Sequence, residues 1–343
     1  MLARLFVLLP FSLTIPEGEQ FPVYEYADEG YHVRIFPPGR SDRPGPPPDE
    51  VDQILIDGVP AFQADALRID FHKESFDRSK ERNFDPPLEV VRRAVNSFIV
   101  RLRHVAHAGH VRALDFRDFR TVTWRIRYLN DDESELEPDE KLVRGRGVLH
   151  WSFGWTALTK QVWEDVHTLP LDYEPPPWEE LLLDAQSDLP RVGPAVVLAA
   201  TALEVFIAHV LDDLAARSSV PAPLWNWIST RDGAYSREPT VEEQYDRLLM
   251  FFTGHSLKTE ARLWESFMNL KTARNTFVHK GIAKIGGVQV SPETANHLIV
   301  SASEVVAKVR EWLPPEVHWP VFKHEINVQI FKKLTRDQDE ERR

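Results

Sequence analysis

The residues best suited to chemistry lie in the stretch ARNTFVHKG, residues 273–281, where a segment of regular apolar spacing ends. Arg274 occupies a position that the apolar stripe of a helix would give to a leucine, and a charge there belongs at the end of a core or in a cleft. Asn275 and His279 are four residues apart and so share one helix face. Gly281 is suited to follow the helix end, which puts His279 in the last turn, where the helix dipole favours a positive charge.

An arginine and a histidine placed in this way suit phosphodiester chemistry. The guanidinium of Arg274 can hold the charge that builds on a phosphate in a transition state. The imidazole of His279 can take a proton from a ribose 2′-hydroxyl or give one to the leaving oxygen, and such a reaction needs no metal ion. For this chemistry the two groups must point into a shared crevice that solvent can reach. The alternative is a polar helix end with a glycine stop, because basic residues are common at helix C-termini.

Glu204 is the second candidate, because it interrupts the nearly apolar segment Ala195–Leu211. A carboxylate in such a helix should find a partner or stay protonated. One interpretation is that Glu204 pairs with Arg274 or His279 across a helical bundle and holds them in position. The other is that Glu204 is an ordinary surface residue. His209, five residues later, is expected to be a packed or partly exposed core histidine.

The elements that must position these residues are helices. Pro194 can begin an apolar helix that runs to about Arg217, and Thr240 with Glu243 forms a capping box for a second helix, which Gly254 ends. The next two helices end at Gly281 and before Pro314-Pro315, and their apolar stripes are Leu263, Phe267 and Leu270 in one and Ala295, Leu298, Ala302, Val305 and Val309 in the other. Four helices joined by fairly short loops predict an antiparallel up-and-down bundle.

This arrangement resembles the HEPN family of nucleic-acid-associated helical bundles. The hallmark of the family is an arginine, usually followed by a polar residue such as asparagine, and a histidine after four to six intervening residues. Here four residues separate Arg274 from His279. The resemblance covers roughly residues 178–313, in which LWESFMNLKTARNTFVHKG is similar to the third helix of the family and TALEVFIAHVLDDL to an earlier helix with an acidic residue. Three other pairs in this chain also fit the bare spacing, namely Arg101/His107, Arg103/His110 and Arg144/His150. The pair Arg274/His279 differs from them in its place at a helix end, in the asparagine after the arginine and in the nearby glycine.

The resemblance implies a metal-independent endoribonuclease, acting as a toxin or in defence against phage, that leaves a 2′,3′-cyclic phosphate and a 5′-hydroxyl. It implies His279 as general acid/base, Arg274 as phosphate ligand and Asn275 as a residue that orients the pair, with Glu204 in support. It also implies a homodimer in which two motifs face one cleft. Some members have lost catalysis and serve as nucleic-acid-binding, protein-binding or dimerisation modules. A third reading is a purely structural salt bridge between Arg274 and Glu204.

The first half of the chain lies outside the resemblance and is predicted to be rich in strands. Its apolar start, Met1–Leu13, resembles a signal peptide, but it is short, contains Pro10 and lacks a small-residue cleavage site, so we expect a first β-strand. An amphipathic helix is expected from Leu88 to Val105 after two prolines, and residues 37–50 form a proline-rich loop. Further strands are expected at residues 21–26, 31–36, 66–71, 121–129 and 147–153.

The predicted fold is therefore α+β, with an N-terminal mixed β-rich domain followed by an all-α four-helix bundle. The expected domains are a mixed α/β domain of unknown role in residues 1–170, a linker in 171–177, the HEPN-like bundle in 178–315 and a tail in 316–343. The tail is expected to return as a strand before it frays.

Composition limits the class of protein. The 343 residues carry a net charge of −12 and contain no cysteine, which excludes disulfides and thiolate metal sites and suits a cytoplasmic location. The segment Ala195–Leu211 is apolar enough for a membrane span, but Glu204 and His209 favour a helix buried in a soluble bundle, so no membrane partner is expected.

Two clusters in the first half invite functional interpretations that we do not favour. The first cluster consists of Arg92, Arg93, Arg101 and Arg103, which could bind RNA. No aromatic residues that could stack on bases are interleaved with these arginines, so we expect the arginines to be solvated or paired with acids such as those of residues 131–140. The second cluster consists of His104, His107 and His110, which have the spacing of metal ligands. No nearby carboxylate completes such a ligand set, so no metal or other cofactor is expected.

Overall fold

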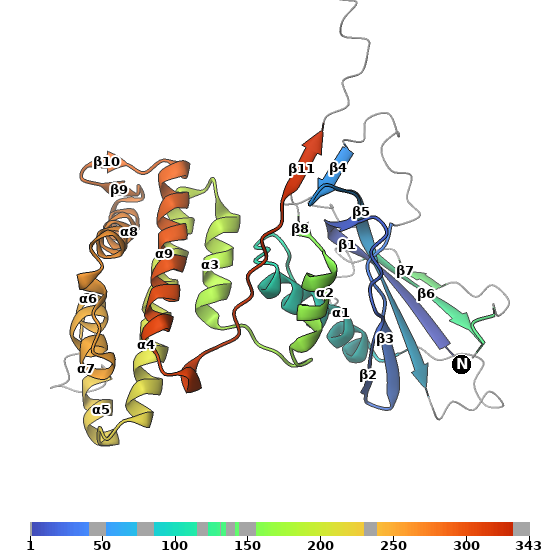
Figure 1. The fold of residues 1–343 in the computed structure, drawn as a ribbon, viewed down its shortest axis with the longest axis horizontal. Coiled ribbons are helices and arrows are strands. Elements are labelled where there is room, and N and C mark those ends of the chain that lie inside the picture. The colour runs from blue at the N-terminus through green and yellow to red at the C-terminus, as the bar shows by residue number, and fades with distance from the viewer. Residues whose placement is uncertain are drawn as a thin grey trace, which may run out of the picture. The chain divides into compact units, whose positions relative to one another are not determined.

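The computed structural model describes residues 2–40, 53–73, 86–114, 123–130, 132–134, 141–143, 156–229 and 239–331. The chain divides into two compact units, one formed by residues 1–174 with 322–343 and the other by residues 175–321 (Figure 1). The predicted strand at residues 147–153, most of the proline-rich loop, most of the acidic segment, the Arg144/His150 pair and the last residues lie outside the described residues.

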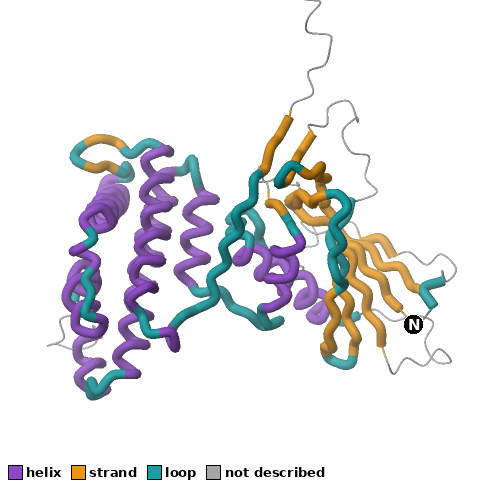
Figure 2. Tube along the Cα trace, in the orientation of Figure 1, coloured by secondary structure: helices purple, strands orange, loops and turns teal. Residues whose placement is uncertain are grey.

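The first unit is built on one sheet whose central strands are β5 and β1. Its strands are β1 (Leu2–Pro16), β2 (Tyr24–Asp28), β3 (Tyr31–Ile35), β4 (Gln53–Ile56), β5 (Val59–Lys73), β6 (Thr123–Leu129), β7 (Lys141–Val143), β8 (Thr156–Ala157) and β11 (Val328–Phe331). They run in the order β11-β4-β5-β1-β6-β7, while β3 joins β5 and β2 joins β3. Figure 2 shows the strands of this unit in orange. The pairings are antiparallel except for that of β8 with β1. The tail residues thus return to this unit as β11.

The predicted first strand is confirmed, and its residue pattern explains its place in the sheet. Odd-numbered residues of β1 from Ala3 to Ile15 are buried, while most of the even-numbered ones are half-buried, which is the period of a strand with one core face. The pairing of β1 with β5 is irregular between Leu8 and Leu13. Pro10 lies in this interval, and proline lacks the N–H that a ladder position needs.

Two helices pack against the core face of the sheet, and one of them was predicted. In α1 (Leu88–Val105) the expected stripe is buried against the sheet, although Leu88 at its start is exposed. The second helix, α2 (Lys160–Thr168), begins at Thr159, whose hydroxyl accepts a hydrogen bond from the Val162 N–H. Trp163 of α2 is fully buried, and its indole N–H donates to the Pro22 carbonyl at 2.9 Å.

The outer face of the sheet carries an ion-pair network centred on Asp70. This side chain is fully buried and accepts two hydrogen bonds from each of Arg4 and Arg68, at 2.7–3.2 Å. Burial alone would raise the pKa of Asp70, but the hydrogen bonds from the two guanidinium groups outweigh it and hold this pKa below its ordinary value.

We expect Asp70→Asn to lower the free energy of unfolding by about 2 kcal/mol at neutral pH, less than for a fully buried pair because the arginines are partly exposed. The pKa of Asp70 is lowered by folding, so its contribution is present above the ordinary carboxyl pKa and is lost as pH falls through the folded value. Urea unfolding between neutral pH and pH 3 tests this. The difference in free energy of unfolding between wild type and variant should shrink as the pH falls. A difference that stays constant down to pH 3 would contradict the lowered pKa of Asp70.

The arginines of α1 differ in part from the prediction, and the three histidines lie at its end and just beyond it. Arg92 pairs with Glu89, and Arg93 pairs with Asp28 and Glu29. Arg101 is not solvated but fully buried, because its guanidinium donates to the carbonyls of Ser97 and Leu169 inside the core, and Arg103 is buried as well. Each histidine has its own partner: His104 bonds Tyr173, His107 bonds the Phe322 carbonyl and His110 bonds Thr156.

The second unit is helical, so the α+β class is confirmed. Its elements are α3 (Pro177–Asp188), α4 (Val192–Arg217), α5 (Ala222–Ser229), α6 (Val241–Glu243), a π-helical turn (Gln244–Leu248), α7 (Leu249–Thr253), α8 (Ala261–Lys280), the short strands β9 (Lys284–Ile285) and β10 (Val288–Gln289), and α9 (Pro292–Trp312). Helix α4 is the centre of the unit, since it packs against α3, α8 and α9.

Most of the predicted helix ends of this unit are confirmed, although α4 begins at Val192 rather than at Pro194. The capping box of Thr240 and Glu243 is present, and the Ser291 hydroxyl caps α9. Gly254 and Gly281 end α7 and α8 with φ of 76° and 71°. This left-handed conformation favours glycine, because a Cβ there clashes with the backbone.

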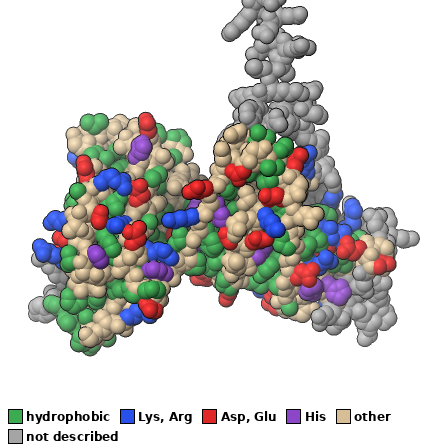
Figure 3. All heavy atoms as spheres, viewed as in Figure 1, with side chains coloured by type: hydrophobic (Ala, Val, Ile, Leu, Met, Phe, Trp, Pro, Cys, Tyr) green, Lys and Arg blue, Asp and Glu red, His purple; other side chains and the backbone are tan. Residues whose placement is uncertain are grey.

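Helix α4 also has the length and composition of a membrane span, and it is the one helix of the described residues that meets this test. In its most apolar 18-residue window, 56% is buried inside the unit. Core helices of soluble proteins pass the same test. On the face shown in Figure 3, basic, acidic and apolar side chains are intermixed over the unit.

Candidate functional site

Arg274 lies on α8 at the edge of the core, with a third of its side chain exposed. Leu270 and Ala273, which precede it on α8, are buried, so the helix is anchored in the core just before the guanidinium. One terminal nitrogen, Nη1, donates to the side-chain oxygen of Asn275 at 3.1 Å. Nε is buried without a hydrogen-bond partner. A third of the side chain is exposed, but Nε itself is buried, so only the rest of the guanidinium is open to a ligand from solvent.

Glu204 faces Arg274 from α4. Its Oε1 lies 3.9 Å from Nη2 of Arg274, which is an ion-pair distance but too long for a hydrogen bond. The Glu204 side chain is 37% exposed, because it lies at the margin of the buried α4 face that includes Leu203 and Phe206. The pair is therefore loose, and a bound anion can compete with Glu204 for the guanidinium.

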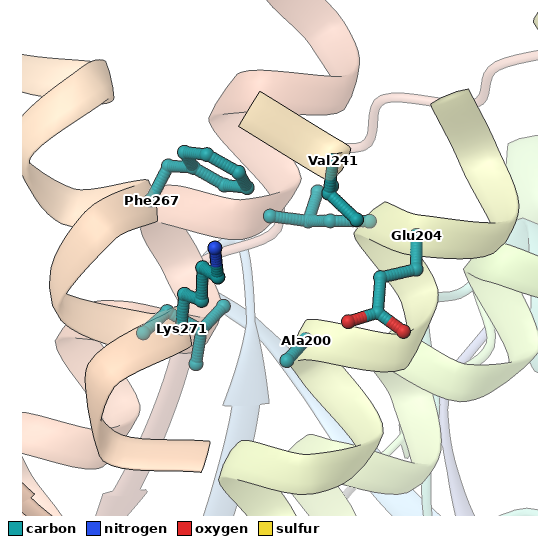
Figure 4. A pocket seen from close by; sticks show the side chains of 7 residues that line it. Ala200, Glu204, Val241, Phe267 and Lys271 are labelled. Atoms are coloured by element: carbon teal, nitrogen blue, oxygen red, sulfur yellow. The ribbon is translucent and has the colours of Figure 1, made fainter. Parts of the chain in front are cut away.

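Lys271 and Glu242 belong to the same cluster, and sequence reasoning missed both. Lys271 lies one turn before Arg274 on α8 and pairs with Glu242 of α6, which the capping box places at the start of its helix. In Figure 4, Lys271 and Glu204 project into one small pocket from α8 and α4. Burial lowers the pKa of Lys271, Arg274 lowers it further, and Glu204 opposes the shift. The spacing of three residues between Lys271 and Arg274 is the signal that could have revealed this neighbour.

A buried tyrosine fixes the segment that carries Glu242. Tyr245, in the π-helical turn, is fully buried and donates its hydroxyl to the Leu203 carbonyl of α4 at 2.9 Å. Burial raises the pKa of this phenol well above its ordinary value, and the nearby charge of Glu204 adds to the shift. The phenol therefore stays neutral and acts as a fixed hydrogen-bond donor that ties the α6 region to α4.

His279 does not join this cluster. It lies in the last turn of α8, where its side chain is exposed, and within the described part of the chain no hydrogen bond or ion pair connects it to Arg274. A separation of five residues places the two side chains about 140° apart around a helix. We expected both side chains to point into one crevice. Within a single chain they diverge and make no direct contact. Asn275, by contrast, is in place beside Arg274.

The cluster can bind an anion but has no evident set of metal ligands. Two cations, Arg274 and Lys271, lie among two carboxylates, Glu204 and Glu242, in a place that solvent partly reaches. A phosphate could take the place of the loosely held Glu204 at the guanidinium. Among the residues that the structure describes, no three histidine or acidic side chains are grouped so that they could hold a metal ion.

We expect Glu204→Gln to change the free energy of unfolding by less than about 1 kcal/mol, because the ion pair is long and about one-third exposed. Urea denaturation of the wild type and the variant at neutral pH measures this. A loss of more than about 3 kcal/mol would instead make the pair a structural element of the core. Arg274→Met serves as the second variant and should likewise preserve stability.

No protein-family model, curated protein or solved structure matches this chain.

Proposed function

We propose that the helical unit is a HEPN-like four-helix bundle and that the protein is a cytoplasmic, metal-independent endoribonuclease. In this proposal Arg274 binds the scissile phosphate and stabilises the charge that develops on it, and Asn275 holds the guanidinium in position. His279 moves the proton of the 2′-hydroxyl or of the leaving oxygen. Glu204 keeps Arg274 in place until substrate arrives. Growth arrest on overexpression would fit a toxin or an effector of anti-phage defence.

The observation that carries the proposal is the state of the Arg274 guanidinium. It is one-third exposed, oriented by Asn275, held only loosely by Glu204 and accompanied by Lys271 one turn away.

In this proposal the active form is a homodimer. His279 is exposed and lies about 140° round the helix from Arg274, so the two groups of one copy do not face the same phosphate. Two copies that pack through the helical units can bring the motif of each toward the other. We therefore propose that the reaction takes place in a cleft between two copies.

The test is an assay of labelled RNA with the purified protein in the presence of a chelator. The proposal predicts fragments with 2′,3′-cyclic phosphate and 5′-hydroxyl ends. The matched control is the same RNA with every 2′-hydroxyl methylated, which lacks the nucleophile and should remain intact. Absence of cleavage by a confirmed dimer, or cleavage of the methylated strand, would contradict the proposal.

The second candidate is a non-catalytic module that binds a nucleic acid or a protein, or that dimerises, through the same helix end. The separation of Arg274 from His279 favours it, because a binding site does not need the two groups to act on one atom. It predicts no cleavage, together with loss of dimerisation or partner binding in Arg274→Ala. Sedimentation of the wild type and the variant separates the two candidates.

A further inference from the structure

Apolar side chains are exposed to solvent where α5 and α7 lie. Helix α5 has no buried residue, although most of its side chains are apolar. Leu224 and Trp227 of α5 are 46% and 58% exposed, and Met250 and Phe251 of α7 are 41% and 70% exposed. These four side chains form the α5–α7 patch. Large apolar groups that are exposed together are typical of an interaction surface.

An aromatic contact joins the two helices of the patch. The ring of Trp225 lies edge to face on that of Phe252, with centroids 5.6 Å apart, and Phe252 in turn contacts Phe251 at 5.0 Å. The indole N–H of Trp225 donates to Asp212 of α4 at 2.8 Å. Trp225 thus anchors α5 to the unit. Leu224 and Trp227 are three residues apart, share a helix face and remain exposed.

The exposed apolar surface of the patch is large for a single chain. An aromatic side chain offers roughly 200 Å², so the exposed parts of Trp227 and Phe251 together amount to about 250 Å². With Leu224 and Met250 the patch reaches about 400 Å², which is the size of the largest apolar patch on a typical soluble chain. A surface of this size can form the core of a contact with a partner.

The α5–α7 patch carries no charge. Neither α5 nor α7 contains a charged residue. In a chain of net charge −12, a strongly charged partner would gain nothing from this surface, because it meets no opposite charge there. A second copy of the patch, by contrast, can face the first without the like-charge repulsion that acts between other parts of two such chains.

The segments that precede the two helices carry charges of both signs. The last turns of α4 contain Asp212, Asp213 and Arg217, and the π-helical turn contains Asp246 and Arg247, of which Arg247 is 81% exposed. Around a two-fold axis, acidic residues of one copy can face basic residues of the other. A lipid surface is a poorer match, because anionic lipids attract an excess of basic residues and these segments have none.

We propose that two copies of the chain associate through the α5–α7 patch, with Trp227 and Phe251 at the centre of a two-fold contact. Tryptophan, phenylalanine and methionine are enriched in protein interfaces. Two patches and their surroundings bury on the order of 1,000 Å² in total, which is at the low end for a specific interface. The association is therefore reversible, with a dissociation constant in the micromolar range, and dilute samples contain single chains.

This contact lies far from His279. Helix α8 begins soon after α7 and has 20 residues, which span about 30 Å, and the β9–β10 hairpin follows its other end. Figure 1 shows α5 and α7 at the opposite end of the helical unit from this hairpin. The contact is thus separate from the one through which the two motifs of the proposed ribonuclease would meet. It does not rest on that function.

The test is sedimentation of the full chain at about 1 to 100 µM, as wild type, Trp227→Glu, Phe251→Glu and Val300→Glu. We expect each of the first two variants to raise the dissociation constant at least about 100-fold, because each places a charge in the contact on both copies. Val300 of α9 is 43% exposed and lies outside the patch, so Val300→Glu is the matched control and should associate like the wild type.

Two results would overturn the proposal. One is a wild type that stays a single chain at about 100 µM, whether or not it sediments with vesicles of phosphatidylcholine and phosphatidylserine, because binding to the vesicles would assign the patch to a membrane. The other is unchanged association of both Trp227→Glu and Phe251→Glu with native circular dichroism.

RNA cleavage by the same samples separates this inference from the proposed function. If the copies associate through the patch but no RNA is cut, the contact stands and the ribonuclease fails. If RNA is cut while Trp227→Glu and Phe251→Glu associate like the wild type, the ribonuclease stands and this contact fails.

Discussion

Arg274→Ala should lower the rate of RNA cleavage by about 10²- to 10³-fold, the usual cost of removing one donor that stabilises a transition state. The physical reason is the loss of the partly unsatisfied guanidinium that lies between Asn275 and Glu204. The fold should be unaffected, because the ion pair with Glu204 is long and about one-third exposed. Initial rates on a labelled RNA, with thermal unfolding of the same samples, measure both effects.

Two further variants make this result specific. Arg274→Lys keeps the charge but loses the planar fork of donors, so it should recover only part of the rate. Glu204→Gln removes the competing carboxylate and should leave substrate binding equal or stronger. A rate in Arg274→Ala within about threefold of the wild type would remove this residue from the transition state.

Phe206→Ala should lower the free energy of unfolding of the helical unit by about 4 kcal/mol. The side chain is fully buried on α4, and its ring contacts those of Trp178 and Trp319 at centroid distances of 5.3 and 5.6 Å. Truncation leaves a cavity among large aromatic groups that cannot collapse easily. Urea unfolding followed by tryptophan fluorescence reports this directly, because both neighbours are indoles.

The matched control is Phe251→Ala on α7, in the same unit. Phe251 is 70% exposed, so its removal should change the free energy of unfolding by no more than about 0.5 kcal/mol. Equal losses in the two variants would mean that α4 is not the centre of the core. A small loss in Phe206→Ala alone would show that the aromatic cluster can repack.

Elements with strong local signals were predictable from the sequence. The strand β1, the helix α1 and the ends of α7 and α8 follow from alternation, apolar period and the glycines Gly254 and Gly281. The helix α3 was missed, although Pro177 opens it in the manner typical of a first helical turn. The β9–β10 hairpin was missed as well, although Gly286-Gly287 is a strong turn signal.

The candidate site was less predictable, because its contacts join distant segments. Sequence spacing places Lys271 near Arg274, but nothing local indicates that Glu242, 29 residues earlier, is the ion-pair partner of Lys271. The burial of Arg101 has the same cause, since its guanidinium bonds the Leu169 carbonyl 68 residues away. The helical period does indicate that side chains five residues apart, such as Arg274 and His279, diverge, and the prediction of a shared crevice gave this too little weight.

The most direct test of the central claim compares RNA cleavage by the wild type, His279→Ala and His297→Ala, all in the presence of a chelator. His297 is also an exposed histidine, on α9, and has no role in the proposed reaction. The account predicts that His279→Ala loses at least about 10²-fold in rate while His297→Ala cuts as fast as the wild type. Equal cleavage by all three proteins would contradict it.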